Sequence, residues 1–195
     1  MQKMLRLPLS KRFDKPVVRL PDYGHIFCLF DTGASVAVWC SDVEYFKKSF
    51  PKAKDTDSKV WLSGFGGDGE IAAVYSIPEF ILKTAEISVK FRELRVAIST
   101  KLRYGFDLIL PGVIFSKMDI RINHRGGENS IQIYFDRDEY GIGMSIRHFT
   151  PRQLNKISEK YGVDLSDNQD FGNTEYCFVQ GTDDFSENSF AGKIE

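Results

Sequence analysis

The sequence predicts a mainly β protein, and two observations carry the prediction. The 195 residues include 16 Phe and 8 Tyr, and aromatic residues, like the many Val and Ile, favour strands. From Val17 to about Ile122, short apolar segments alternate with turn residues. The length suits one domain with an appended terminal segment, large enough to bury a core without disulfides or metals.

The first segments predict a hairpin followed by a helix. Residues 17–20 and 25–30 are apolar and flank the turn sequence PDYG. Residues 41–50 fit a short helix that Ser41 caps and Pro51 stops.

The next segments continue the β pattern. Residues 59–65 and 70–77 bracket the glycine-rich sequence GFGGDG and predict a second hairpin. Four more elements follow: an alternating, half-buried strand at 86–98, a continuous apolar strand at 106–110, a short helix at 113–118 and a strand at 119–123.

The C-terminal part predicts a hairpin, a helix and a tail. Residues 131–135 and 142–146 flank turn residues and predict the hairpin. A capping-box Thr150 begins a helix that should run to Tyr161 and end at Gly162. We therefore divide the chain into a domain at 15–123, an extension at 124–162 and a tail at 163–195.

The tail differs from the rest of the chain in charge. Residues 163–195 hold eight Asp and Glu against one Lys, a net charge of −7, whereas the whole chain carries −1. Acidic, polar segments of this kind are usually solvated. The near-neutral total excludes a general argument for binding nucleic acid or an anionic membrane. No segment has the ~20 apolar residues of a membrane span, and the N-terminus has no secretory apolar run.

The strongest candidate for chemistry is the sequence FDTGAS, in which Asp31 follows the apolar strand IFCLF. A carboxylate at the end of a buried strand is held stiffly and is partly desolvated. Gly33 lets two backbones approach closely because it has no Cβ. Two such carboxylates face to face share a proton, so one acts as base and the other as acid on one water molecule. The alternative is an ordinary strand-to-turn aspartate followed by a turn glycine.

This segment resembles the active-site loop of the retropepsin family, the single-domain aspartic proteases of retroviruses and their cellular relatives. The hairpin at 61–71 is similar to the family's glycine-rich flap, and residues 106–122 resemble its later strand, turn and helix. The resemblance covers roughly residues 17–123 and implies a closed acid-protease barrel, which the C-terminal hairpin and helix would extend.

The resemblance also implies residue roles. Asp31 would activate water and protonate the departing amine, and Thr32 would tie two loops together. Gly33 and Ser35 would flank the substrate backbone, with Ala34 between them where pepsin-like enzymes usually carry Ser. The flap residues that would cover the substrate are Phe65, Gly66 and Gly67, and the apolar pair that would wall the aspartate loop is Ile109 and Leu110.

Two departures from the family pattern concern spacing. Pro111 stands where the family normally has glycine, and Gly112 follows one position late. The loop between Asp31 and the flap is also longer than in the viral enzymes. Both features support an alternative hypothesis, in which the chain is a catalytically silent, protease-like dimeric binding or assembly module.

Dimerisation follows from counting carboxylates. The chain has one Asp-Thr-Gly, and Asp170-Phe171-Gly172 has no apolar strand before it. The active site should therefore form across a two-fold axis, with one Asp31 from each chain. A small β-rich structural protein with a chance triplet would instead be a monomer.

Other patterns carry less weight. GFGGDG fits G-x-G-x-x-G, but a β-leaning segment follows it instead of a helix. The three histidines and three cysteines show no spacing for a metal site or a catalytic pair. Lysines near 47–54 suit a solvated face better than a nucleic-acid patch. We expect no cofactor, no metal, no nucleic acid or membrane partner, a cytoplasmic location and a peptide or protein substrate.

The apolar sequence YCFV at 176–179 interrupts the acidic tail. An extended apolar tetrapeptide is what a peptidase cleft accepts by strand addition, so this segment could be an internal pseudosubstrate. The interpretation that we favour is that this segment forms a last edge strand or an anchoring contact.

Overall fold

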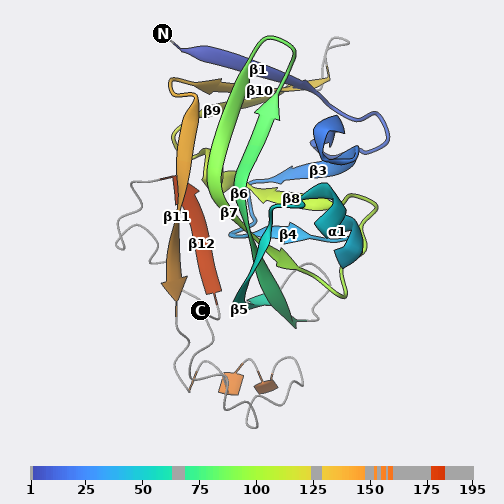
Figure 1. Cartoon of the computed structure of the whole chain (residues 1–195), viewed down its shortest axis with the longest axis vertical. Helices are drawn as coiled ribbons and strands as arrows, with labels where there is room; N and C mark the ends of the chain where they lie inside the picture. The colour runs from blue at the N-terminus through green and yellow to red at the C-terminus, as the bar shows by residue number, and fades with distance from the viewer. Residues whose placement is uncertain are drawn as a thin grey trace.

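The computed structural model confirms a mainly β protein (Figure 1). It describes residues 2–62, 69–123, 129–147 and 177–182, together with Arg152, Asn155, Lys156, Ser158 and Glu159. No helix in this described part is long and apolar enough to cross a membrane.

The larger of two sheets has the strand order β12-β11-β7-β4-β8-β3-β2, and β6 joins β5 to β7 beside this path. Its strands are β2 (Val17–Leu20), β3 (Ile26–Asp31), β4 (Ala37–Trp39), β5 (Lys54–Leu62), β6 (Glu70–Lys83), β7 (Ser88–Ile98), β8 (Leu108–Pro111), β11 (Glu139–Arg147) and β12 (Cys177–Thr182). In the middle of the sheet, β8 runs parallel to β3 and antiparallel to β4.

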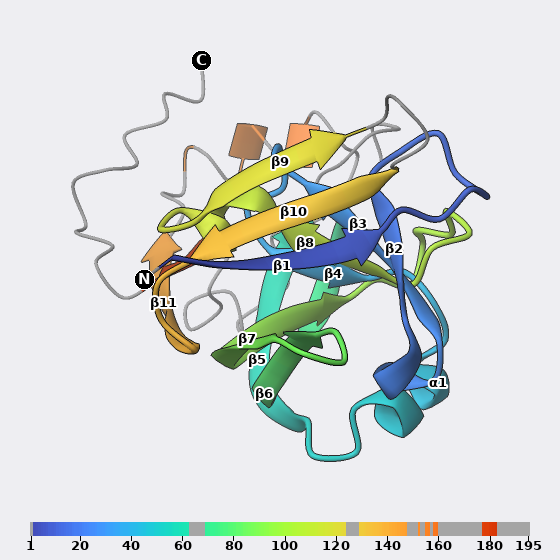
Figure 2. The same cartoon turned by 90° about the horizontal axis from the view of Figure 1, so that it is seen from above.

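A smaller antiparallel sheet has the order β1-β10-β9 and lies as a separate layer over the larger one (Figure 2). Its strands are β1 (Lys3–Pro8), β9 (Asp119–Asn123) and β10 (Ser130–Phe135). Leu5 of β1 pairs with Ile133 of β10, and both side chains are fully buried. The core thus includes strands from both sides of the 15–123 segment.

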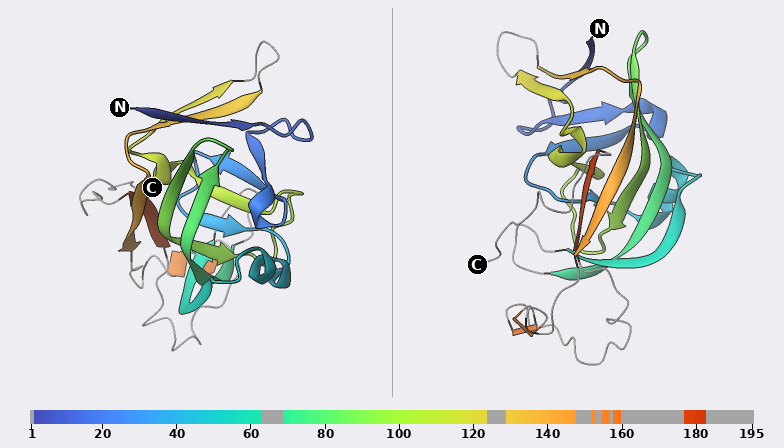
Figure 3. Two further views of the ribbon diagram at one scale, coloured as in Figure 1. Left: turned by 45° about the horizontal axis from the view of Figure 1, so that its top comes forward. Right: turned by 90° about the vertical axis from the view of Figure 1, so that its left-hand side faces the viewer.

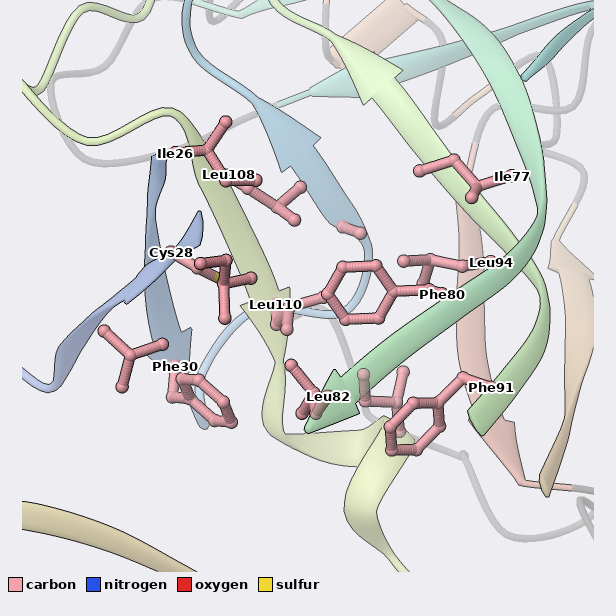
Figure 4. Close-up of a cluster of buried hydrophobic side chains, with 14 of the residues drawn as sticks. Ile26, Cys28, Phe30, Ile77, Phe80, Leu82, Phe91, Leu94, Leu108 and Leu110 are labelled. Atoms are coloured by element: carbon pink, nitrogen blue, oxygen red, sulfur yellow. The ribbon is translucent and has the colours of Figure 1, made fainter. Parts of the chain in front are cut away.

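The main core contains buried side chains of both sheets, and Figure 4 shows side chains that β3, β6, β7 and β8 contribute to it. It is rich in aromatic rings, which bury large areas and prefer edge-on or offset contacts. Phe80 of β6 and Phe91 of β7 are fully buried, with ring centroids 6.4 Å apart. Phe30 of β3 stacks on Phe115 at 5.2 Å. This last contact anchors the residue that precedes Asp31.

Both predicted hairpins of the first half are confirmed. β2 pairs antiparallel with β3, and β5 pairs antiparallel with β6. The helix α1 (Val43–Ser49) ends before Pro51 as expected, but the prediction of its cap was wrong. Asp42 is the N-cap, and its side chain accepts from the backbone N–H groups of Glu44 and Tyr45. The hydroxyl of Ser41 instead donates to Asp107 Oδ1 at 2.5 Å.

The prediction of a closed barrel was wrong, because no closed barrel forms among the described strands. The larger sheet is open, with β12 at one end of its order and β2 at the other. Closure needs a strand that bridges the two ends, and β10 instead pairs with β1 and β9 in the separate layer.

The C-terminal hairpin prediction was right about its two strands and wrong about their pairing. β10 and β11 follow each other in the chain but pair with different partners, because β11 joins β7 and then β12. The helix predicted at 150–161 lies largely outside the described residues. The five described residues of this segment are helical.

The tail contributes the edge strand β12, as we predicted for the apolar sequence YCFV. β12 pairs antiparallel with β11 from Cys177, opposite Arg147, to Thr182, opposite Ile142 (Figure 3). It also lies against β5 and against the 3-10 helix η2 (Gly112–Phe115), which is the short helix that the sequence predicted at 113–118.

Candidate active site

Asp31 is the last residue of a strand that is supported on both sides. β3 pairs antiparallel with β2 and parallel with β8, where Phe30 lies opposite Leu110 and Asp31 opposite Pro111. Residues 26–30 are apolar because this strand lies inside the sheet and faces packed side chains. The half-buried carboxylate is therefore carried by a rigid support.

The loop after β3 orients that carboxylate through its own backbone. The N–H of Gly33 donates to Asp31 Oδ1 at 2.8 Å, and the N–H of Ala34 donates to the Asp31 carbonyl at 3.3 Å. Thr32, Gly33 and Ser35 are exposed. Within the described part of the chain, Asp31 Oδ2 and the Thr32 hydroxyl make no hydrogen bond, so both are available to an outside group.

Gly112 packs directly against this loop. A Cβ built on Gly112 would lie 2.7 Å from the Cα of Thr32, which is closer than real side chains approach a backbone atom. Glycine is therefore required where η2 begins. The glycine that contacts the aspartate loop is Gly112, whereas Pro111 ends β8 opposite Asp31.

The predicted supports Ile109 and Leu110 lie on opposite faces of β8. Leu110 is fully buried in the main core, and Ile109 belongs to a second apolar cluster. Ala34 packs against this second cluster. The buried members of the cluster are Val17, Leu29, Val36, Val38, Cys40, Val60, Leu62, Ala72, Val74, Ala97, Phe106 and Ile109. It joins the aspartate loop to the base of the β5–β6 hairpin.

The predicted flap residues Phe65, Gly66 and Gly67 lie outside the described residues. The base of their hairpin is described and is closely packed. A Cβ on Gly69 would lie 1.8 Å from the ring of Trp61, so the indole needs a glycine there. Leu62 and Glu70 pair across this base.

Glu70 fastens the hairpin base to the end of β7, and sequence reasoning missed it. Glu70 is 6% exposed, and its carboxylate accepts hydrogen bonds from the Ser99 hydroxyl, from the Thr100 N–H at 2.9 Å and from the Thr100 hydroxyl at 2.7 Å. Lys101 Nζ donates to the Gly69 carbonyl at 3.1 Å. The only signal in the sequence is a carboxylate at the start of an apolar strand, which does not identify its partners.

A second missed carboxylate, Asp107, lies at the other end of the β3–β8 pair. Its Oδ2 accepts from the Phe27 N–H at 2.8 Å, and its Oδ1 accepts from Ser41. The backbone of Asp107 also bonds to Phe27 and to Cys40. Asp107 therefore joins β3, β8 and the segment after β4.

Neither Cys28 nor Cys40 is a candidate nucleophile. Burial raises the pKa of the Cys40 thiol to about 12 and raises the pKa of Cys28 well above its ordinary value. A nucleophilic cysteine needs a lowered pKa. His25 is exposed, and His124 and His148 lie outside the described residues. Among the described residues, no three His, Cys, Asp or Glu side chains gather in a way that could hold a metal ion.

The structure is similar to the crystal structure of a retropepsin-like aspartic protease from Rickettsia conorii. The match has a TM-score of 0.42 and 13% sequence identity, and it covers 69% of this chain and 92% of the other. No protein-family model matches the sequence, and no curated protein matches it.

Proposed function

We propose that the chain is an aspartic endopeptidase that acts as a homodimer. The observation that carries this proposal is the state of the Asp31 carboxylate. One oxygen is fixed by the Gly33 N–H at 2.8 Å, and the other makes no hydrogen bond within the described residues. A carboxylate that is oriented but not fully engaged is suited to general acid–base work.

The second carboxylate of the site comes from a second chain. Peptide hydrolysis by this mechanism needs one carboxylate as base and one as acid, and the chain has one Asp-Thr-Gly. The exposure of Thr32, Gly33 and Ser35 supports a loop that meets a symmetric copy. Thr32, whose hydroxyl has no partner in the described part of the chain, would then hydrogen-bond to the partner's loop.

The chemistry requires only groups that the two loops supply. An ionised Asp31 takes a proton from a water molecule, and the resulting oxygen nucleophile attacks the peptide carbonyl. The protonated Asp31 of the partner subunit gives its proton to the departing amine, and the C–N bond breaks. Residues 63–68 would cover the substrate, and Glu70 would hold the base of the β5–β6 hairpin to β7.

The first experiment is cleavage of a peptide library, followed by mass spectrometry in steps from about pH 4 to 7. Wild type and Asp31→Asn are compared at concentrations where both are dimers. Cleavage by wild type alone supports the peptidase and defines its specificity. Intact dimers that cut nothing would instead favour the binding or assembly module.

A mixing experiment tests the shared site. If each active dimer needs two Asp31 carboxylates, adding an equal amount of the Asp31→Asn chain should lower the activity per wild-type chain to about half, because random pairing leaves half of the wild-type chains in mixed dimers. A ninefold excess should lower it to about one tenth. Activity that does not change on mixing would mean that one chain suffices.

A further inference from the structure

β11 consists of two parts with different partners. Glu139, Tyr140 and Gly141 pair in parallel with Lys90, Phe91 and Arg92 of β7. From Ile142 to Arg147 the strand pairs only with β12 among the described residues. We call residues 142–147 the outer half of β11. The backbone N–H and C=O groups of this outer half therefore rely on β12 for their strand-to-strand hydrogen bonds.

The partner of this outer half comes from far along the chain. The 29 residues 148–176 separate the outer half of β11 from β12. A two-stranded ribbon is at best marginally stable by itself. The ribbon of outer β11 and β12 gains further support because β12 also lies against η2 and β5.

The sequence of β12 suits strand addition. Its six residues, CFVQGT, carry no charge, although they lie in a segment with a net charge of −7. Main-chain hydrogen bonds supply much of the affinity when an extended peptide joins a sheet edge. The rest of the chain, residues 1–162, carries about +6 by difference from the total of −1. Opposite net charges favour docking of the tail on the body.

We propose that the outer half of β11 is a binding site for an extended, uncharged peptide segment, and that this chain occupies the site with its own residues 177–182. Covalent attachment raises the effective concentration of the chain's own strand, so a peptide in solution binds only when that strand is released. This site differs chemically from the Asp31 site, because it binds a peptide through backbone hydrogen bonds between strands. It adjoins the aspartate loop through η2, whose Gly112 packs on Thr32.

The test disables β12 within the full chain. Successive N–H groups of a strand point to opposite sides, so replacing both Val179 and Gln180 by Pro removes at least one bond to β11 whichever residue donates. All chains carry Asp31→Asn, so that no cleavage interferes. The matched control is Asn188→Pro, which lies beyond the end of β12 at Thr182.

Hydrogen exchange is the first readout. In the Val179→Pro/Gln180→Pro chain, the amides of residues 142–147 that bond to β12 should exchange roughly tenfold faster or more than in the control chain, because local opening no longer has to break the ladder. Exchange in β3 and β8 should not change, which shows that the body remains folded. Equal exchange of residues 142–147 in the two chains would overturn the proposal.

Peptide binding is the second readout. A fluorescent peptide that spans Cys177–Thr182 should bind the double-proline chain at least about tenfold more tightly than the control chain, whose site is occupied. Binding should restore the protection of residues 142–147. A peptide that binds both chains equally, or that restores no protection at millimolar concentration, would overturn the proposal. Neither readout depends on hydrolysis, so the result stands whether or not Asp31 cleaves peptides.

Discussion

The paired strands β3 and β8 carry a carboxylate at each end, and the two carboxylates have opposite surroundings. Both are half-buried. Asp107 accepts a hydrogen bond on each carboxylate oxygen, from Phe27 and from Ser41, and its backbone bonds to Phe27 and Cys40. Among the described residues, the Asp31 carboxylate accepts one hydrogen bond, from the Gly33 N–H in its own loop.

This difference separates a structural acid from a candidate catalytic one. A carboxylate whose two oxygens both accept hydrogen bonds stabilises the fold, because its loss leaves buried donors without partners. A carboxylate with a free oxygen contributes little to folding but can exchange a proton with a bound water. Similar burial therefore does not imply a similar role.

The largest expected effect separates the two acids by activity. Asp31→Asn should lower the rate of peptide cleavage by about 10³-fold or more, because the amide cannot act as a base or an acid. Asp107→Asn should leave most of the rate, since Asp107 lies at the opposite end of the β3–β8 pair from Asp31. Cleavage assays on folded protein, checked by circular dichroism, measure both. Equal losses in the two variants would remove the distinction.

The next effect concerns the support of the Asp31 loop. Gly112→Ala should reduce the free energy of unfolding by about 2–3 kcal/mol, because the new methyl group overlaps the Thr32 backbone. Pro111→Ala is the neighbouring control and should cost less, about 1 kcal/mol. Urea titrations compare the two variants. A larger loss for Pro111→Ala would show that the tight contact lies at that position instead.

A smaller effect separates the two acids by stability. Asp107→Ala should cost about 2 kcal/mol, because the Phe27 N–H and the Ser41 hydroxyl lose their acceptor. Asp31→Ala should change stability by no more than about 0.5 kcal/mol, because the Gly33 N–H is exposed and water replaces the carboxylate. Thermal unfolding midpoints measure both. An equally large loss for Asp31→Ala would mean that Asp31 is structural too.

The smallest effect extends the comparison to a third carboxylate, Asp136. The Tyr140 hydroxyl donates to it at 2.8 Å, which lowers the pKa of Asp136 from its ordinary value of 3.8. A lowered folded-state pKa gives stability that is present above 3.8 and is lost as the pH falls through the folded-state value. The advantage of wild type over Tyr140→Phe should therefore shrink in acid. Urea midpoints at neutral pH and at about pH 2 measure it. An advantage that does not change would assign the effect to the hydrogen bonds that the Tyr140 hydroxyl accepts from the backbone N–H groups of Asp136 and Arg137.

Local patterns predicted much of the fold. The turn sequence PDYG between two apolar runs identified the β2–β3 hairpin, and the apolar run before Asp31 identified β3 as a buried strand. Both features depend on residues close together in the chain. The cap of α1 was misjudged because Ser41 and Asp42 are adjacent and both can cap. The choice depended on Asp107, which lies far along the chain and engages Ser41.

Pairings between distant segments were not predictable in the same way. β10 and β11 are strands, as expected, but a short connection does not decide whether consecutive strands pair. Leu5 and Leu7 of β1 supply an apolar face that matches Ile133 and Ile131 of β10. That match places β10 in a separate layer and leaves the larger sheet open.

The sequence by itself determined most of the elements, though not β1 and β4, and the identity of the candidate acid, because hydrophobic periodicity, turn residues and the FDTGAS motif act over a few positions. Only the tertiary structure decided which carboxylates accept hydrogen bonds from distant residues, which glycine contacts the Asp31 loop and which strand pairs with the outer half of β11. Those outcomes depend on groups brought together from distant parts of the chain. Glu70 with Thr100, Gly112 with Thr32, and β12 with β11 are each contacts whose partners no local pattern specifies.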